Sequence, residues 1–233
     1  MNPALYILCE GERDELFYER LCERLSGFTF TRPEEFRLRD GSNWKTAIVG
    51  ARLLLDRFSR WSTPQQIALL IAIDNDRAPG HPGGRVYPQL LPAHDRKKEP
   101  RYAKLQALVN EKLGSDPAMR NVQAVIAMPV EMVESWLLLL LDPSRTEESL
   151  PPFAEADSAI AREYYGKEPP AQLKNLREDE RRHRSVDDDT HFFDAADRGD
   201  LERLSAVSRS FAVFRQEAEV LAKVWKQTDA DSL

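Results

Sequence analysis

Four carboxylates in this sequence have the type and spacing needed to bind a divalent ion together. Glu10 and Asp14 follow an apolar run near the N-terminus, and Asp74 and Asp76 end the strongest apolar run of the chain. Residues two apart in a strand point to the same side, so Asp74 and Asp76 should face one way. Like charges at such distances need a cation among them, and oxygen ligands favour a hard ion. The sequence therefore predicts a Mg²⁺ or Mn²⁺ site.

This site requires the apolar runs to be neighbouring strands of one sheet. The pattern predicts strands over 4–9, 34–40, 66–74 and 122–129, and helices over 14–28, 44–61, 130–141 and 208–225. Strands that alternate with helices indicate an α/β fold with a mostly parallel sheet of about four strands between helices. Ligands of such sheets lie beyond the carboxyl ends of the strands. The four carboxylates converge there if the first and third predicted strands are neighbours.

Simpler interpretations compete at some of these positions. Acidic residues in the first turn of a helix stabilise its dipole, and we prefer this explanation for Glu12 and Glu15. For Asp14 the two interpretations are even. The simpler one is weakest for Asp74 and Asp76, because two acids directly after a buried strand destabilise a fold unless they have a use.

Composition bounds the class of protein. The chain has 233 residues, a net charge of -6 and two cysteines, Cys9 and Cys22. These features predict a globular protein of a reducing compartment rather than a basic nucleic-acid coat. The longest apolar run, 136–141, is too short to cross a membrane, and we expect a cytoplasmic protein. We expect an α/β core over 1–143 and a helical C-terminal elaboration over 144–233 that packs on it.

The motifs together resemble the TOPRIM fold of topoisomerases, primases and the overcoming-lysogenization-defect (OLD) nucleases. Glu10-Gly11 and Asp74-Asn75-Asp76 match its Glu-Gly and DxD motifs, and Asp14 matches an extra acid of the OLD-type nucleases. Glu134-Ser135-Trp136 and Ser210-Phe211-Ala212-Val213-Phe214 resemble motifs of small bacterial TOPRIM-like proteins. The resemblance covers most of the chain.

This resemblance implies a two-metal nuclease. The implied metal ligands are Glu10, Asp14, Asp74, Asp76 and Glu134. Glu131 is the alternative to Glu134, whose simpler interpretation is an acid on a helix surface. The implied catalytic residues are Glu10, Asp74, Asp76 and Lys174. For Lys174, as for any single lysine, an exposed surface position is the favoured explanation.

Basic residues after the DxD motif are candidates for nucleic-acid binding. They are Arg77, Arg96, Lys97 and Lys98. A solvated loop is the simpler interpretation of the last three. The tryptophans lie on helical patterns and are expected in the core; they are Trp44, Trp61, Trp136 and Trp225.

Three functions follow from these expectations. The first is a Mg²⁺-dependent endonuclease acting on DNA or RNA, in defence against phage or mobile elements. The chain has no P-loop, so an ABC- or SMC-like ATPase would be a partner subunit. The second is a catalytically silent TOPRIM module that regulates or assembles such a complex. The third is another DxD-metal enzyme, such as a phosphatase, which the position of the motif disfavours. The sequence leaves self-association open.

Overall fold

The computed structural model describes residues 2–9, 12–33, 44–61, 65–75, 100–114, 116–129, 133–150 and 194–230. Within them, three strands form one parallel sheet in the order β1-β2-β3. The strands are β1 (Ala4–Leu8), β2 (Ile67–Ala72) and β3 (Val122–Ala127). The first and third predicted strands are therefore neighbours, as the site requires.

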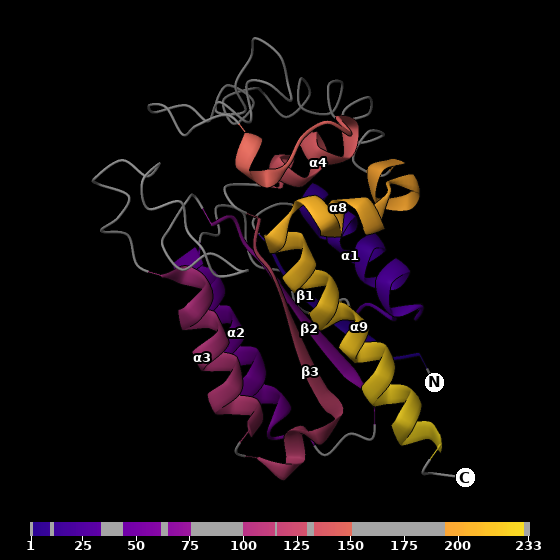
Figure 1. The fold of residues 1–233 in the computed structure, drawn as a ribbon. Coiled ribbons are helices and arrows are strands. Elements are labelled where there is room, and N and C mark those ends of the chain that lie inside the picture. Colours follow the sequence, from indigo (N-terminus) through magenta and orange to yellow (C-terminus); the bar gives the residue numbers. More distant parts are fainter. Residues whose placement is uncertain are drawn as a thin grey trace, which may run out of the picture.

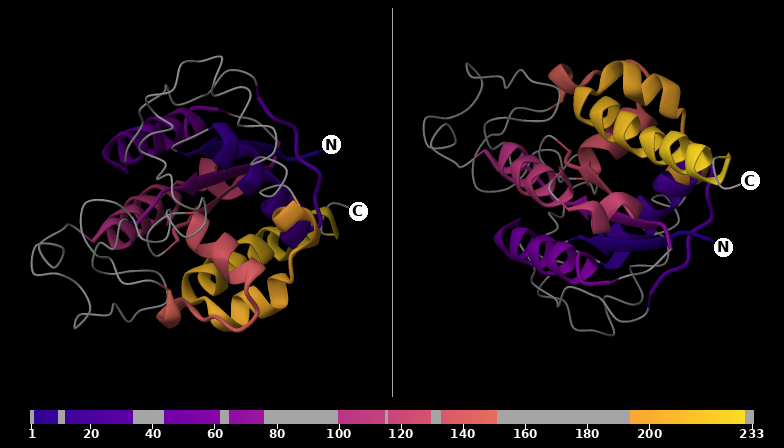
Figure 2. Two further views of the ribbon diagram at one scale, coloured as in Figure 1. Left: turned by 90° about the horizontal axis from the view of Figure 1, so that it is seen from above. Right: turned by 90° about the horizontal axis from the view of Figure 1, so that it is seen from below.

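Helices cover both faces of the sheet (Figures 1 and 2). One face carries α1 (Glu12–Ser26) and α9 (Arg209–Ala230), and the other carries α2 (Trp44–Phe58) and α3 (Arg101–Gly114). Side chains that alternate along each strand fill the two cores. This arrangement confirms the α/β class and the parallel sheet.

Two shorter helices lie above the carboxyl ends of the strands in Figure 1. They are α4 (Glu134–Leu141) and α8 (Leu201–Val207). Both contribute to the core on the α1 and α9 side of the sheet, so the C-terminal helices share that core with the strands. The predicted domain boundary at residue 143 stays a prediction.

Some predicted elements are confirmed and others are not tested. The predicted helix 14–28 is confirmed as α1, which ends one residue before Gly27, whose φ of 73° suits the residue after a helix. On this helix Leu16 is 40% exposed, whereas Phe17 and Leu21 are buried. The predicted strand 34–40 lies outside the described residues. Next to β1, Thr31 forms a parallel bridge with Ala4.

The outer strand β3 is partly covered by α9. Glu217 accepts a hydrogen bond from the backbone N–H of Ile126 at 2.7 Å and another from the Tyr102 hydroxyl at 3.0 Å. Burial raises the pKa of Glu217 above its ordinary value.

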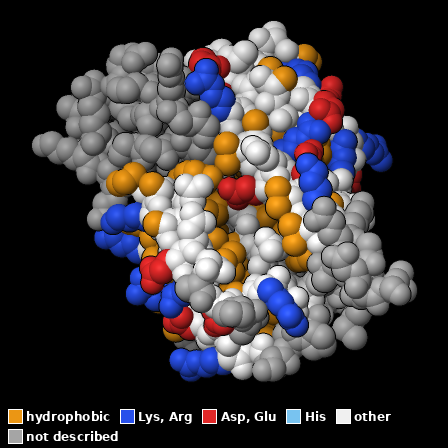
Figure 3. Space-filling model, turned by 60° about the horizontal axis from the view of Figure 1, so that its bottom comes forward, with side chains coloured by type: hydrophobic (Ala, Val, Ile, Leu, Met, Phe, Trp, Pro, Cys, Tyr) orange, Lys and Arg blue, Asp and Glu red, His pale blue; other side chains and the backbone are white. Residues whose placement is uncertain are grey.

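On the lower face of the molecule, hydrophobic side chains gather around a hollow (Figure 3). No helix of the described residues is long and apolar enough to cross a membrane.

Candidate functional site

The carboxyl end of β2 delivers Asp74 to the α1 and α9 side of the sheet. Ala72 belongs to the core on that side and Ile73 to the opposite core, so alternation returns Asp74 to the first side. Asp74 is partly exposed, whereas Asn75 is buried. The backbone here is held by Arg101, whose Nη1 donates to the carbonyl oxygen of Asp74 at 2.6 Å.

Tyr18 is the buried centre around which the described carboxylates gather. Asp14 precedes it by one turn of α1, on the same face of the helix. The ring of Tyr18 makes an edge contact with Trp136, at 6.0 Å between centroids, and Glu134 lies two residues before Trp136. The negative charges of Asp14, Asp74 and Glu134, from three separate parts of the chain, act on this one phenol.

The pKa of Tyr18 reflects the negative charges in this cluster. Burial and then the negative charges of Asp74 and Asp14 raise the pKa of Tyr18 well above its ordinary value, with smaller contributions from Cys9 and Glu134. Its hydroxyl is therefore neutral at physiological pH and available as a hydrogen-bond donor. We name Asp14, Tyr18, Asp74 and Glu134 the Tyr18 cluster.

The predicted ligand set is only partly described. Asp14, Asp74 and Glu134 are described, and in the part of the chain that the structure describes no three His, Cys, Asp or Glu side chains come close enough to hold an ion. The remaining predicted residues lie outside the described residues; they are Glu10, Asp76, Glu131, Lys174, Arg77, Arg96, Lys97 and Lys98. The metal site thus stays a prediction.

The interpretation of Glu134 as a helix-surface acid is wrong. Its side chain is only 5% exposed, at the first residue of α4. A buried carboxylate beside other acids is costly unless a cation or donors compensate it. Glu134 is thus a buried acid at the start of α4 and stays a candidate ligand.

The Glu-x-Trp motif at 134–136 and the Ser-Phe-x-x-Phe motif at 210–214 contact each other. The indole Nε1 of Trp136 donates to Ser210 Oγ at 2.9 Å. The same ring stacks on Phe214 at 5.5 Å and makes an edge contact with Phe211 at 5.1 Å. The Ser-Phe-x-x-Phe motif therefore packs against the Glu-x-Trp motif and fixes the start of α4, which carries Glu134.

Glu147 completes this connection and was not predicted from the sequence. It follows α4 in a 3-10 turn (Glu147–Ser149) and is only 4% exposed. Its carboxylate accepts from the backbone N–H of Arg209 at 2.8 Å, from Ser208 Oγ at 3.1 Å and from both the backbone N–H and Oγ of Ser210. These donors form the start of α9, so Glu147 caps that helix. Burial raises the pKa of Glu147 although its hydrogen bonds lower it.

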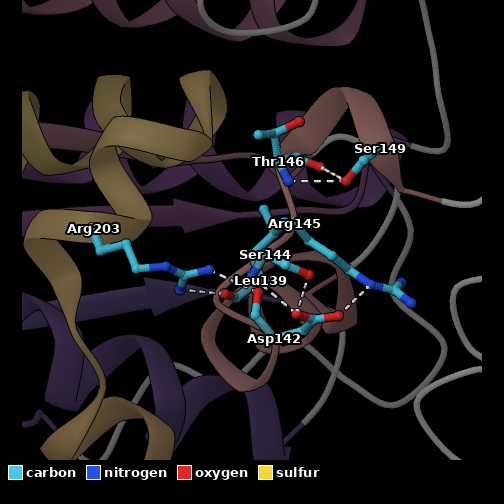
Figure 4. A network of polar contacts seen from close by, with 7 residues as sticks. All are labelled: Leu139, Asp142, Ser144, Arg145, Thr146, Ser149 and Arg203. Atoms are coloured by element: carbon cyan, nitrogen blue, oxygen red, sulfur yellow. Dashed lines mark hydrogen bonds and ion pairs between the residues drawn. The ribbon is translucent and has the colours of Figure 1, made fainter.

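The C-terminal end of α4 is anchored as well (Figure 4). Arg203 of α8 donates to the carbonyl oxygens of Leu139 at 2.6 Å and Asp142 at 2.7 Å. The Asp142 carboxylate accepts from Ser144 Oγ at 2.7 Å and from Arg145 Nε at 2.9 Å. Contacts at both ends therefore hold α4, and with it Glu134, above the sheet.

Comparison with known proteins adds no relative to this description. No protein-family model matches the chain, and no curated protein or solved structure matches it. The candidate site therefore depends on the arrangement of the Tyr18 cluster and on the motifs of the sequence.

Proposed function

We propose that this chain is a metal-dependent nuclease of TOPRIM-like fold that hydrolyses phosphodiester bonds in DNA or RNA. The observation that supports it is the position of Asp74: it follows the central strand β2, whose neighbour is β1, and its charge acts on Tyr18 together with those of Asp14 and Glu134. An acid that served only to make the end of a strand soluble would not need to act on the same residue as two other acids.

The chemistry of the described donors fits a hard divalent ion. Asp14, Asp74 and Glu134 offer carboxylate oxygens, the ligands that Mg²⁺ and Mn²⁺ prefer. In the proposal, Glu10 and Asp76 complete the set with these three. When bound, such ions supply charge stabilisation to the attacking and leaving oxygens of a phosphodiester. In the proposal, Lys174 contacts the scissile phosphate.

The proposed setting follows the resemblance. The nuclease acts in the cytoplasm, against phage or mobile elements, together with an ABC- or SMC-like ATPase subunit. The fourth strand of the TOPRIM-like sheet is part of the same proposal. A silent assembly module of the same complex is the alternative, and it predicts no ion-dependent cleavage.

The first test is a calorimetric titration of Mn²⁺ into three proteins. They are the wild type, the double variant Asp74→Ala with Asp76→Ala, and a control variant Glu148→Ala with Asp194→Ala. The control removes two exposed acids that are not among the charges acting on Tyr18, so the change in net charge is the same. We expect Mn²⁺ to bind the wild type and the control, to raise their melting temperatures, and to leave the Asp74/Asp76 variant unaffected.

Cleavage is then measured on labelled DNA and RNA with Mg²⁺, with the same three proteins. Cleavage by the wild type and the control, but not by the Asp74/Asp76 variant, supports the nuclease. Equal Mn²⁺ binding by all three proteins, or by none, would contradict the proposed site. Mn²⁺ binding without cleavage of either polymer would favour the assembly module.

A further inference from the structure

Three cationic side chains surround one indole beside the candidate site. Trp44 is the first residue of α2, and Arg101 is the first residue of α3. The Arg101 guanidinium lies 5.4 Å from the centre of the Trp44 ring, Lys104 Nζ lies at 5.8 Å and Lys45 Nζ lies at 6.0 Å. We name Trp44, Lys45, Arg101 and Lys104 the Trp44 cluster.

The Trp44 cluster lies at the same end of the sheet as Asp74. Arg101 connects the two, because the guanidinium that lies over Trp44 also donates to the carbonyl oxygen of Asp74. Arg101 is buried, whereas Lys45 and Lys104 are exposed. The cluster thus has a fixed inner cation and two outer ones that solvent reaches.

Three cations within about 6 Å of one ring centre are a local concentration of basic side chains in a chain whose net charge is -6. The face of the indole attracts such cations. The first backbone N–H groups of α2 and α3 add the positive ends of two helix dipoles at the same place. Basic side chains and two helix N-termini therefore lie together beside Asp74.

We propose that the Trp44 cluster binds the phosphates of a polynucleotide strand whose neighbouring phosphate lies at the Tyr18 cluster. The proposal rests on the proposed function and names how its substrate is held. Cations that come from two helices suit successive phosphates better than a single phosphate ion. Trp44 is partly buried and already carries cations, so it organises the lysines instead of stacking on a base.

The test measures binding of fluorescent DNA and RNA strands, about 20 nucleotides long, by anisotropy in EDTA at several salt concentrations. The variant is Lys45→Gln with Lys104→Gln. The matched control is Arg52→Gln with Arg120→Gln: both residues are exposed, and Arg120 lies in the 3-10 turn Pro117–Asn121, which precedes β3 at the opposite end of the sheet. Both variants lose two positive charges.

We expect the lysine variant to bind about tenfold more weakly and its salt dependence to lose a slope of about 1.4 to 1.8. The control should match the wild type. Inorganic phosphate and polyglutamate should compete poorly with the strand. Equal weakening of both variants, no binding by the wild type, or strong competition by polyglutamate would each overturn the proposal. Because EDTA removes divalent ions, these outcomes do not depend on whether the Tyr18 cluster binds Mn²⁺.

Discussion

Glu134 and Glu147 are both buried carboxylates. Glu134 is the first residue of the short helix α4, and Glu147 follows that helix in the chain. Glu134 is 5% exposed and Glu147 is 4% exposed. Donors from Ser208, Arg209 and Ser210 converge on Glu147. Around Glu134, by contrast, the charges that act on the shared neighbour Tyr18 are those of other acids.

Both acids are buried, so burial alone does not distinguish a structural role from a role in ion binding. A carboxylate that accepts hydrogen bonds from the start of a helix has a structural use, because it satisfies donors that the helix leaves open. In the proposed site, Glu134 instead supplies its carboxylate to a divalent ion. Removing Glu147 should therefore reduce stability, and removing Glu134 should reduce ion binding.

The largest effect is expected from Glu147→Ala. This change leaves the part-buried N–H group of Arg209 and the buried N–H group of Ser210 without this acceptor, at a cost of about 3 kcal/mol in the free energy of unfolding. Glu147→Gln is the control, because its amide oxygen accepts from the backbone and its amide nitrogen donates to the serine hydroxyls. Urea unfolding measures both variants.

The same comparison includes Glu134→Gln, in Mn²⁺ titrations at a temperature where every variant is folded. We expect Glu134→Gln to lose Mn²⁺ binding and Glu147→Gln to keep it. If Glu147→Gln abolished Mn²⁺ binding while Glu134→Gln did not, the two roles would have to be exchanged.

The sequence predicted those parts of the site that depend on local pattern. A buried strand followed by acids is visible in the apolar run before Asp74. The sequence left open whether the first and third predicted strands are neighbours, and the pairing of β1 with β2 answers this question. Tyr18 could not be predicted in this way, because an aromatic residue on the apolar side of a helix looks like ordinary core. Its importance comes from Trp136 and Asp74, which are remote in the chain.

Glu147 and Arg101 were missed for a related reason. Glu147 stands among polar residues after α4, and its donors are about 60 residues further along the chain. Arg101 follows a basic stretch that suggested a solvated loop, yet it is buried against Trp44 and Asp74. Tertiary contacts of this kind have no local signature in the sequence.

A smaller effect is expected from Tyr18→Phe, which tests whether the Tyr18 cluster binds the ion as one unit. If the Tyr18 hydroxyl donates a hydrogen bond to a carboxylate that holds the ion, it orients that ligand. Loss of such a partner lowers metal affinity by about tenfold or more. The affinity for Mn²⁺ is measured by calorimetry.

The control for this change is Tyr102→Phe, which removes another tyrosine hydroxyl, the one bonded to Glu217. This variant should bind Mn²⁺ as the wild type does. Equal Mn²⁺ affinities for Tyr18→Phe and the wild type would show that the phenol only packs against Trp136.

The smallest effect concerns the pH dependence of stability, which separates Glu147 from an exposed acid. Burial raises the pKa of Glu147 above its ordinary value of 4.5, so the folded state binds this proton more tightly than the unfolded state does. The stability that comes from proton binding is complete below pH 4.5 and is lost as pH rises through the folded pKa. In Glu147→Gln this decrease should be absent, leaving the contributions of other groups such as Glu217, whose pKa is also raised. Urea unfolding of both proteins from about pH 4 upward measures the difference, and parallel curves would mean that the start of α9 stabilises the charged form of Glu147 as well as water does.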